Sequence, residues 1–262
     1  MPVHCSVAIE PLSTDDFREL DYKVMRHAFE SHNDLCRLAD ERIYQADLAK
    51  RLKDSGFAVH RELEVRLAFR EYCKAFYLDF VVEERGVYEL KVANAISDAH
   101  VGQLLTYLLL LDLPRGKLLN FGNSKVESRF VNAPFRSAKR RDFIVDGCDY
   151  RGNDTFRQLI VELLRDWGTS LSIPIYDEAI ISLLGGREKV EVMLPLCRDS
   201  THLGNQRFHL ATEDSAYQIT TISRGKSAFE KQLSRLINYS PLREIHWINV
   251  EHELVSLKTV TR

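Results

Sequence analysis

Residues 75–93 read AFYLDFVVEERGVYELKVA. Two apolar runs flank the polar stretch EERG (83–86), and a glycine in a short turn between such runs is typical of a β-hairpin. On the second strand, Glu89 and Lys91 are two positions apart, so their side chains leave the same face. Asp79 stands on the first strand, and folding of the hairpin can bring it beside Glu89. This stretch therefore predicts two paired strands that gather three charged side chains.

The three charged residues suit a divalent metal ion. Asp79 and Glu89 offer two hard oxygen ligands and the backbone carbonyl of Leu90 a third, while magnesium typically completes such a set with water and a substrate phosphate. Lys91 is suited to orient an attacking water and to stabilise charge in the transition state. A charged pair in an otherwise apolar strand is costly unless it is paired or binds an ion. The alternative is a half-exposed strand whose Glu and Lys face water.

The surrounding pattern predicts a mixed domain of helices and strands. Apolar residues at helical spacing and capping residues indicate helices, and alternating apolar residues indicate strands. We expect helices at 13–32, 40–53 and 98–112, and strands at 59–69, 75–82, 87–93, 117–121 and 126–131. The order of helix, helix, three strands, helix and two strands is that of an α/β or α+β domain, which we assign to residues 1–135.

Polar residues on two of these helices flank the charged hairpin. Glu41 and Tyr44 are one turn apart and share a face of the second helix. His100, Gln103 and Tyr107 form a polar stripe on the otherwise apolar helix that follows the hairpin. Singly, such residues are typical of a solvent-facing helix edge, but together and in this order they indicate a site.

The rest of the chain predicts a second, smaller α+β domain at 142–262. Helices are expected at 155–167, 177–184 and 227–238, and strands at 190–196, 208–212, 217–222, 245–250 and 254–260. We interpret this region as an accessory domain for substrate selection or self-association. The acids and histidine of EHE (251–253) alternate between two strand faces, which favours a solvated strand end over a metal cluster.

Charge and cysteine content narrow the class of protein. The 262 residues carry a net charge of −2, whereas nonspecific nucleic-acid binders usually have a basic surplus. Any phosphate contact must therefore come from local clusters, such as the basic linker RSAKRR (136–141), for which a solvated linker is an equal alternative.

The five cysteines are scattered singly, as in a reduced cytosolic protein. No apolar run is long enough for a membrane span and no leader is evident, so we expect a cytoplasmic protein.

In this order, the motifs ExxY, D-x9-ExK and QxxxY resemble those of the PD-(D/E)XK nuclease superfamily, on the side of the RecB and phage exonucleases. More closely, the chain resembles the bacterial proteins named after a GxxExxY motif. The resemblance extends from about Leu20 to Pro134. The matching stretches are AFESH (28–32), DERIYQADL (40–48), YLDFVV (77–82), YELKV (88–92), DAHVGQLLTYL (98–108) and LLNFG (118–122).

The resemblance implies a restriction-endonuclease-like core, a mixed sheet flanked by helices, that binds Mg²⁺ or Mn²⁺ and cleaves phosphodiester bonds. It assigns Asp79, Glu89 and Glu41 to the metal, Lys91 to the catalytic water, Gln103 and Tyr107 to the support of the site or the substrate backbone, and His32 to completion of the metal shell. The chain departs from the family where Cys36, Arg37 and Leu38 replace the usual G-P-G. We expect that loop to take a different path.

Together these observations predict a Mg²⁺-dependent nuclease that acts on DNA in preference to RNA. One alternative is a non-catalytic module that keeps the nuclease fold and binds a protein partner. Another is a nuclease component of a defence or stress system that is controlled by its partner. A homo-oligomer or a protein partner would be held through residues 142–262, and no membrane is involved.

Overall fold

The computed structural model describes residues 3–199 and 201–262. Two compact units divide the chain: one holds residues 3–68 and 73–137, and the other holds residues 69–72 and 138–262. The elements of the first part of the chain are β1 (Val3–Cys5), α1 (Thr14–Leu35), α2 (Glu41–Asp54), β2 (Val59–Phe69), β3 (Tyr72–Val82), β4 (Gly86–Lys91), α3 (Asp98–Leu110), β5 (Arg115–Asn120) and β6 (Glu127–Asn132).

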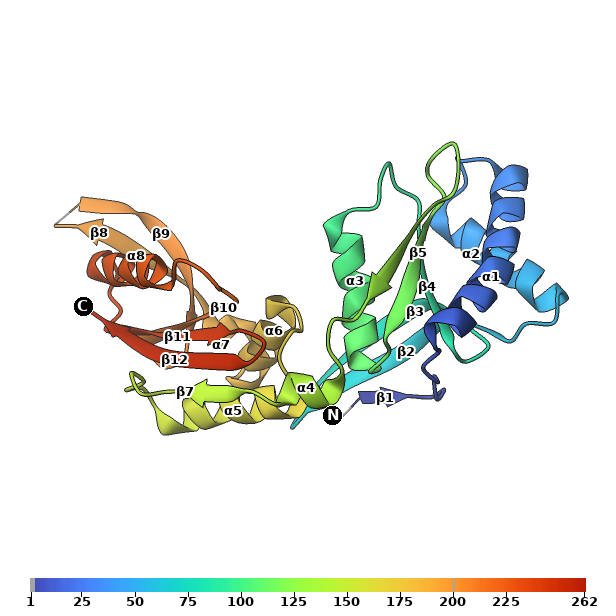
Figure 1. Ribbon diagram of the computed structural model, residues 1–262. Helices are drawn as coiled ribbons and strands as arrows, with labels where there is room; N and C mark the ends of the chain where they lie inside the picture. The colour runs from blue at the N-terminus through green and yellow to red at the C-terminus, as the bar shows by residue number, and fades with distance from the viewer. Residues whose placement is uncertain (1–2, 200) are drawn as a thin grey trace. The chain divides into compact units, whose positions relative to one another are not determined.

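The first unit is a mixed sheet with helices on both faces. Its strand order is β1-β2-β3-β4-β5-β6, and β4 and β5 run parallel while β3/β4 and β5/β6 are antiparallel. Helices α1 and α2 lie on one side of the sheet and α3 on the other (Figure 1). The predicted fold class is confirmed: a mixed α/β architecture consistent with the restriction-endonuclease-like fold.

Local sequence signals account for the helix ends. The side chain of Ser13 accepts a hydrogen bond from the backbone amide of Asp16 and so caps α1. Ser97 and His100 form a reciprocal capping box at the start of α3. Gly56 follows α2 with φ +89°, the backbone region that glycine adopts without a steric penalty. The helices predicted near these residues are confirmed.

Two apolar cores hold the helices to the sheet. On the α1/α2 face, Phe17, Tyr44 and Leu48 pack against strand residues that include Tyr88 and Leu90. On the α3 face, buried leucines of the helix pack against β2, β3 and β5. Each large apolar side chain buried in this way contributes about 1.5–3 kcal/mol. Since Tyr88 and Leu90 face α1 and α2, alternation along β4 directs Glu89 and Lys91 to the opposite face.

The second unit is also a mixed sheet between helices. Its elements are α4 (Ser137–Arg141), β7 (Ile144–Asp146), α5 (Asp154–Trp167), α6 (Ile173–Leu183), α7 (Arg187–Val190), β8 (Glu191–Arg198), β9 (Thr201–Leu210), β10 (Ser215–Thr220), α8 (Lys226–Tyr239), β11 (Glu244–Val250) and β12 (Leu254–Thr261). The strand order is β7-β12-β11-β10-β9-β8, with α8 packed on one face. Short elements β1, α4, β7 and α7 were not predicted, and α6 begins four residues earlier than expected.

The predicted basic linker is helical and carries a structural arginine. Arg140 is 1% exposed and donates hydrogen bonds to the carbonyls of Trp167 and Thr169. Arg136 pairs with Asp112. A solvated linker was therefore the wrong interpretation for Arg140, because its guanidinium satisfies buried carbonyls inside the second unit. The same buried position removes Arg140 from any phosphate contact.

Within the described residues, no helix combines the length and apolar character needed to cross a bilayer. All five cysteines are free thiols.

Candidate active site

The candidate site begins where β3 and β4 separate. The two strands pair through Phe80 and Tyr88, and the next positions along the ladder are Asp79 and Glu89. There the backbone amide of Leu90 donates to Oδ2 of Asp79 at 2.8 Å. The carboxylate of Asp79 is thus fixed against β4 beside Glu89, as the hairpin pattern predicted.

Three carboxylates surround the amine of Lys91. Its Nζ lies 2.7 Å from Oε1 of Glu89 and 3.8 Å from both Oδ2 of Asp79 and Oε1 of Glu41. Glu89 is fully buried, whereas Glu41, the first residue of α2, lies at the partly exposed rim. The structure therefore brings together four of the residues predicted from the sequence.

Burial and mutual repulsion shape the charges of this cluster. Burial, followed by the neighbouring Asp79 carboxylate, raises the pKa of Glu89 to about 8. Burial also raises the pKa of Asp79, although Lys91 and the Leu90 amide oppose this change. For Lys91, burial alone would lower the pKa, but the surrounding carboxylates, Glu89 foremost, raise it overall. The cluster thus holds more negative charge than one ammonium group neutralises.

The donor set fits a hard divalent cation. If all are ionised, three carboxylates and one ammonium sum to −3 + 1 = −2, which one divalent ion would balance. Oε2 of Glu89 is buried and has no hydrogen-bond partner among the described residues. Within the same residues, no group of three or more His, Cys, Asp or Glu side chains is placed so that it could hold a metal ion by itself. The remaining ligands would be carbonyl, water and phosphate oxygens, as magnesium prefers.

Helix α3 contributes the predicted polar pair. The amide of Gln103 donates to the hydroxyl of Tyr107 at 3.0 Å. Burial raises the pKa of Tyr107, and the nearby Glu89 and Asp79 charges raise it further, so this hydroxyl lies within electrostatic reach of the cluster. His100 instead accepts from the Ser97 amide in the capping box, which explains its place in the polar stripe.

Tyr44 and His32 hold loops near the helices that flank the site. The hydroxyl of Tyr44 donates to the carbonyl of Cys36, and its ring stacks on Phe121 at 4.5 Å. The Nε2–H of His32 donates to the carbonyl of Asn123 at 2.8 Å. That nitrogen is therefore engaged away from the carboxylates, and only Nδ1 of His32 is left for a metal.

Sequence reasoning gave no role to Asn120, although it lies in the quoted stretch LLNFG. Its side-chain oxygen accepts from the amides of Ala93 and Gly122, and its amide donates to the Ala93 carbonyl and to Glu127. Asn120 is fully buried and pairs in register with Lys91 across β4 and β5. Asn120 therefore fixes the chain where it leaves β4. The sequence signal that could have identified it is a lone asparagine inside an apolar run.

Residues 251–253, where a solvated strand end was expected, form the loop between β11 and β12. Glu251 pairs with Lys226, and His252 lies near the hydroxyls of Thr169 and Ser170.

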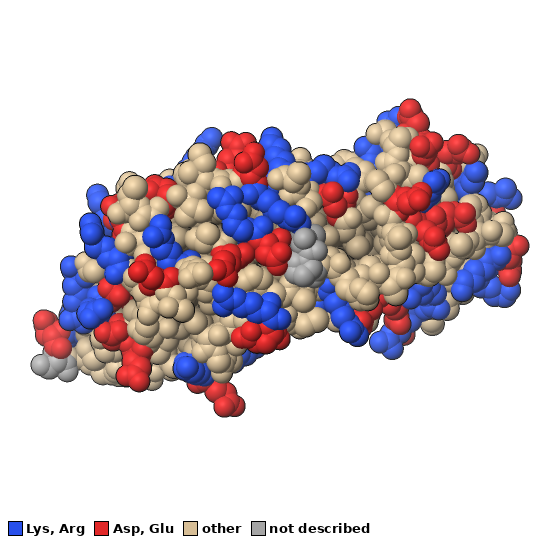
Figure 2. Space-filling view, turned by 90° about the horizontal axis from the view of Figure 1, so that it is seen from below, with Lys and Arg blue, Asp and Glu red and all other residues tan. Residues whose placement is uncertain are grey.

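On the molecular face seen in Figure 2, acidic and basic side chains are interspersed rather than separated. That face offers no broad basic surface for a phosphate backbone.

Comparisons with known proteins give one family. Neither the curated proteins nor the solved structures contain a match to this chain. The matched segment begins within α1 and ends within β6, and it therefore includes all of the candidate site residues. Residues 18–131, a little less than half of the chain, match the family described as the PD-(D/E)XK nuclease superfamily.

Proposed function

We propose that residues 1–135 form a Mg²⁺- or Mn²⁺-dependent nuclease domain that hydrolyses phosphodiester bonds in nucleic acid, DNA in preference to RNA. The observation that carries the proposal is the convergence of Asp79, Glu89 and Glu41 on Lys91, with one buried carboxylate oxygen of Glu89 left without a hydrogen bond. The family match over residues 18–131 supports the same chemistry.

Each residue of the cluster has its own proposed role. Asp79 and Glu89 would hold the ion directly, and Glu41 would complete the site from the rim. A bound divalent cation supplies Lewis acidity toward the phosphate and the attacking water. Lys91 orients that water and donates a hydrogen bond to the phosphoryl oxygen on which negative charge develops. The water oxygen bonds to phosphorus and releases a proton to solvent, the ester P–O bond breaks, and the leaving oxygen takes up a proton from solvent.

Two further residues support this arrangement from α3. Gln103 orients the hydroxyl of Tyr107, which lies close enough to the cluster to feel its charge. We assign both to contact with the substrate backbone or to support of Lys91. His32 is a weaker candidate ligand, since Nε2 is already bonded to the Asn123 carbonyl.

We also propose that the chain is a variant of the GxxExxY group. Cys36 occupies the place of the first glycine of the usual G-P-G and adopts φ +57°, ψ −147°, a conformation that glycine enters without strain. This position therefore favours glycine although the chain carries cysteine there. The cytoplasm, where the five thiols would stay reduced, is the compartment that fits best.

The test is cleavage of fluorescent single- and double-stranded DNA and RNA with Mg²⁺ or Mn²⁺. Glu89→Ala and Lys91→Ala should each lower cleavage by at least about 100-fold, and Glu89→Ala should leave thermal stability nearly unchanged or slightly raised. Lys50→Ala is the matched control, because Lys50 lies on the exposed surface of α2, where it pairs with Asp54. Absence of cleavage on all four substrates would remove the enzyme assignment.

One observation favours a non-catalytic binding module instead. The nearest partner of Glu89 is Lys91, so part of the buried charge is already met without a cation. Calorimetry with Mn²⁺ separates the two functions. No heat of binding in the wild type would support the module, and cleavage that appears only with a co-purified protein would support a partner-controlled nuclease.

A further inference from the structure

The sheet of the second unit contains a gap between β9 and β10. These antiparallel strands pair at Leu210 with Ala216 and at His209 with Tyr217, and then separate. In the same register Arg207 would face Ile219, but no pairing joins them. Beyond the gap, β9 stays paired with β8 and β10 with β11. Two ordered strand pairs therefore border an unfilled position.

Backbone groups on both sides of the gap lack a strand partner. Because the amide of Ala211 donates to the carbonyl of Ser215, every second residue from there along each strand faces the other strand. Arg207 and Ile219 are in this set. Their carbonyls instead accept from the side-chain amides of Gln206 at 3.2 Å and Gln218 at 3.4 Å. These two glutamines substitute for a missing neighbour strand.

A pocket of about 330 Å³ occupies the gap. Its lining comes from both faces of the sheet, since it includes Leu233 and Leu236 of α8 on one face and Asp177 of α6 on the other. Alternation along β9 places Phe208 with the α8 core and Arg207 and His209 on the α6 face. One side of the gap is thus apolar and the other is charged.

The charged side of the gap carries Asp177, His209 and Arg207, of which Arg207 lacks an ion-pair partner among the described residues. Asp177 accepts from Nδ1 of His209 at 3.1 Å and from the hydroxyl of Tyr217 at 2.9 Å. Glu191, the cross-strand neighbour of His209, pairs with Arg187. Arg207 is exposed and forms no salt bridge with any residue that the structure describes. This face can therefore attract an acidic side chain.

We propose that the gap between β9 and β10 binds an extended peptide of a partner protein in which acidic residues alternate with apolar ones. Side chains of a strand alternate between faces, so the acids would meet Arg207 while the apolar residues pack on Leu233 and Leu236. The peptide backbone would bond to Arg207 and Ile219 and displace the two glutamine amides. The three open positions on β10, Gln218 to Thr220, span about 10 Å.

The probe is a fluorescein-labelled peptide, Val-Glu-Leu-Glu-Val, titrated into the full chain and followed by anisotropy. Val-Lys-Leu-Lys-Val should bind at least about 10-fold more weakly. Arg207→Glu should weaken the acidic peptide by a similar factor and strengthen the lysine peptide. Lys231→Glu, the same charge reversal at an exposed position of α8 outside the gap, should leave both affinities unchanged. Hydrogen exchange of the Arg207 and Ile219 amides should slow when the acidic peptide binds.

Three results would overturn the inference. The first is equal binding of both peptides, and the second is binding of the acidic peptide that Arg207→Glu leaves unchanged. The third is concentration-dependent association of the chain with itself that Arg207→Glu abolishes, because the occupant would then be a second copy. Arg207 is exposed, so the variant should fold, and a circular dichroism melt checks this.

Discussion

The Nζ atom of Lys91 lies 2.7 Å from Oε1 of Glu89, and both residues stand on one face of the same strand. Oδ2 of Asp79 and Oε1 of Glu41 each lie 3.8 Å from the same amine. A buried ion pair of this kind is weak evidence for a stabilising role, since the cost of desolvation offsets the attraction. We therefore interpret the cluster as a functional arrangement.

Glu89→Gln should keep or raise the stability of the protein. The change removes a buried carboxylate whose pKa is raised to about 8, and Lys91 keeps Asp79 and Glu41 as counter-charges. Urea unfolding at neutral pH should give a free energy equal to or above that of the wild type, while affinity for Mn²⁺ falls at least about 10-fold by calorimetry. The exposed Glu19→Gln is the control for both measurements. A large loss of stability would mean that Glu89 serves the fold.

Cys36→Gly should stabilise the protein by about 1 kcal/mol. Cys36 adopts φ +57°, ψ −147°, which is unfavourable for a residue with a Cβ atom, and glycine removes that strain at some cost in unfolded-state entropy. Tyr44 holds this conformation through its hydrogen bond to the Cys36 carbonyl. The measurement is thermal unfolding under reducing conditions.

Cys36→Ala separates backbone strain from loss of the thiol. Alanine keeps the Cβ atom, so its melting temperature should match that of the wild type rather than that of the glycine variant. Equal stabilisation by both substitutions would assign the effect to the thiol and not to the backbone.

The sequence was sufficient to predict the nuclease-like sheet and the three charged residues on it. The signals used were local: period-two alternation, a polar turn with glycine, and an acid–base pair in an apolar strand. Each can be recognised without knowledge of tertiary contacts. The convergence of Asp79 and Glu89 followed from the hairpin alone, because strand register in a short hairpin is set by its turn.

The remaining features depend on contacts between residues distant in sequence. The long hairpin of β8 and β9 has no clear alternation, since few of its side chains are buried on either face. Arg140 looked like a solvated charge because the carbonyls of Trp167 and Thr169 that it bonds lie more than 25 positions further along the chain. Asn120 bonds backbone groups at Ala93, 27 positions earlier. No spacing rule connects such pairs.

Lys117→Met should destabilise the first unit by about 3–5 kcal/mol, because it leaves the buried carboxylate of Asp21 without its partner. Nζ of Lys117 lies 2.5 Å from Oδ2 of Asp21 and 4.5 Å from the centre of the Phe130 ring. The other oxygen of Asp21 is buried without a hydrogen-bond partner among the described residues. Urea unfolding of the full chain measures the loss.

The double variant Asp21→Leu/Lys117→Met should recover most of that loss, since two apolar side chains can replace a buried ion pair. Lys23→Met breaks the exposed pair with Glu19 on the same helix and should cost below about 1 kcal/mol. If Lys117→Met costs no more than Lys23→Met, Asp21 must escape to solvent and the pair does not support the fold.

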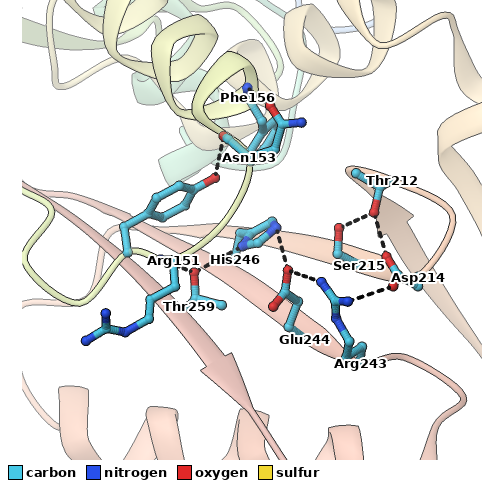
Figure 3. A network of polar contacts seen from close by, with 11 residues as sticks. Arg151, Asn153, Phe156, Thr212, Asp214, Ser215, Arg243, Glu244, His246 and Thr259 are labelled. Carbon is cyan, nitrogen blue, oxygen red and sulfur yellow. Dashed lines mark hydrogen bonds and ion pairs between the residues drawn. The ribbon is translucent and has the colours of Figure 1, made fainter.

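His246 should make the second unit less stable in mild acid. It is 1% exposed, lies between the rings of Tyr150 and Phe156, and contacts Thr259 and Glu244 (Figure 3). Burial lowers its pKa below the ordinary value of 6.5, although Glu244 opposes the change. The unfolded chain therefore binds a proton more readily than the folded chain, so stability is full above pH 6.5 and falls as the pH drops through the folded pKa.

Urea unfolding between pH 7.5 and about 5 should show this decline in the free energy of unfolding. His246→Gln should reduce the decline, whereas the exposed His202→Gln should not. Equal slopes for all three proteins would mean that His246 takes up its proton without disturbing the fold.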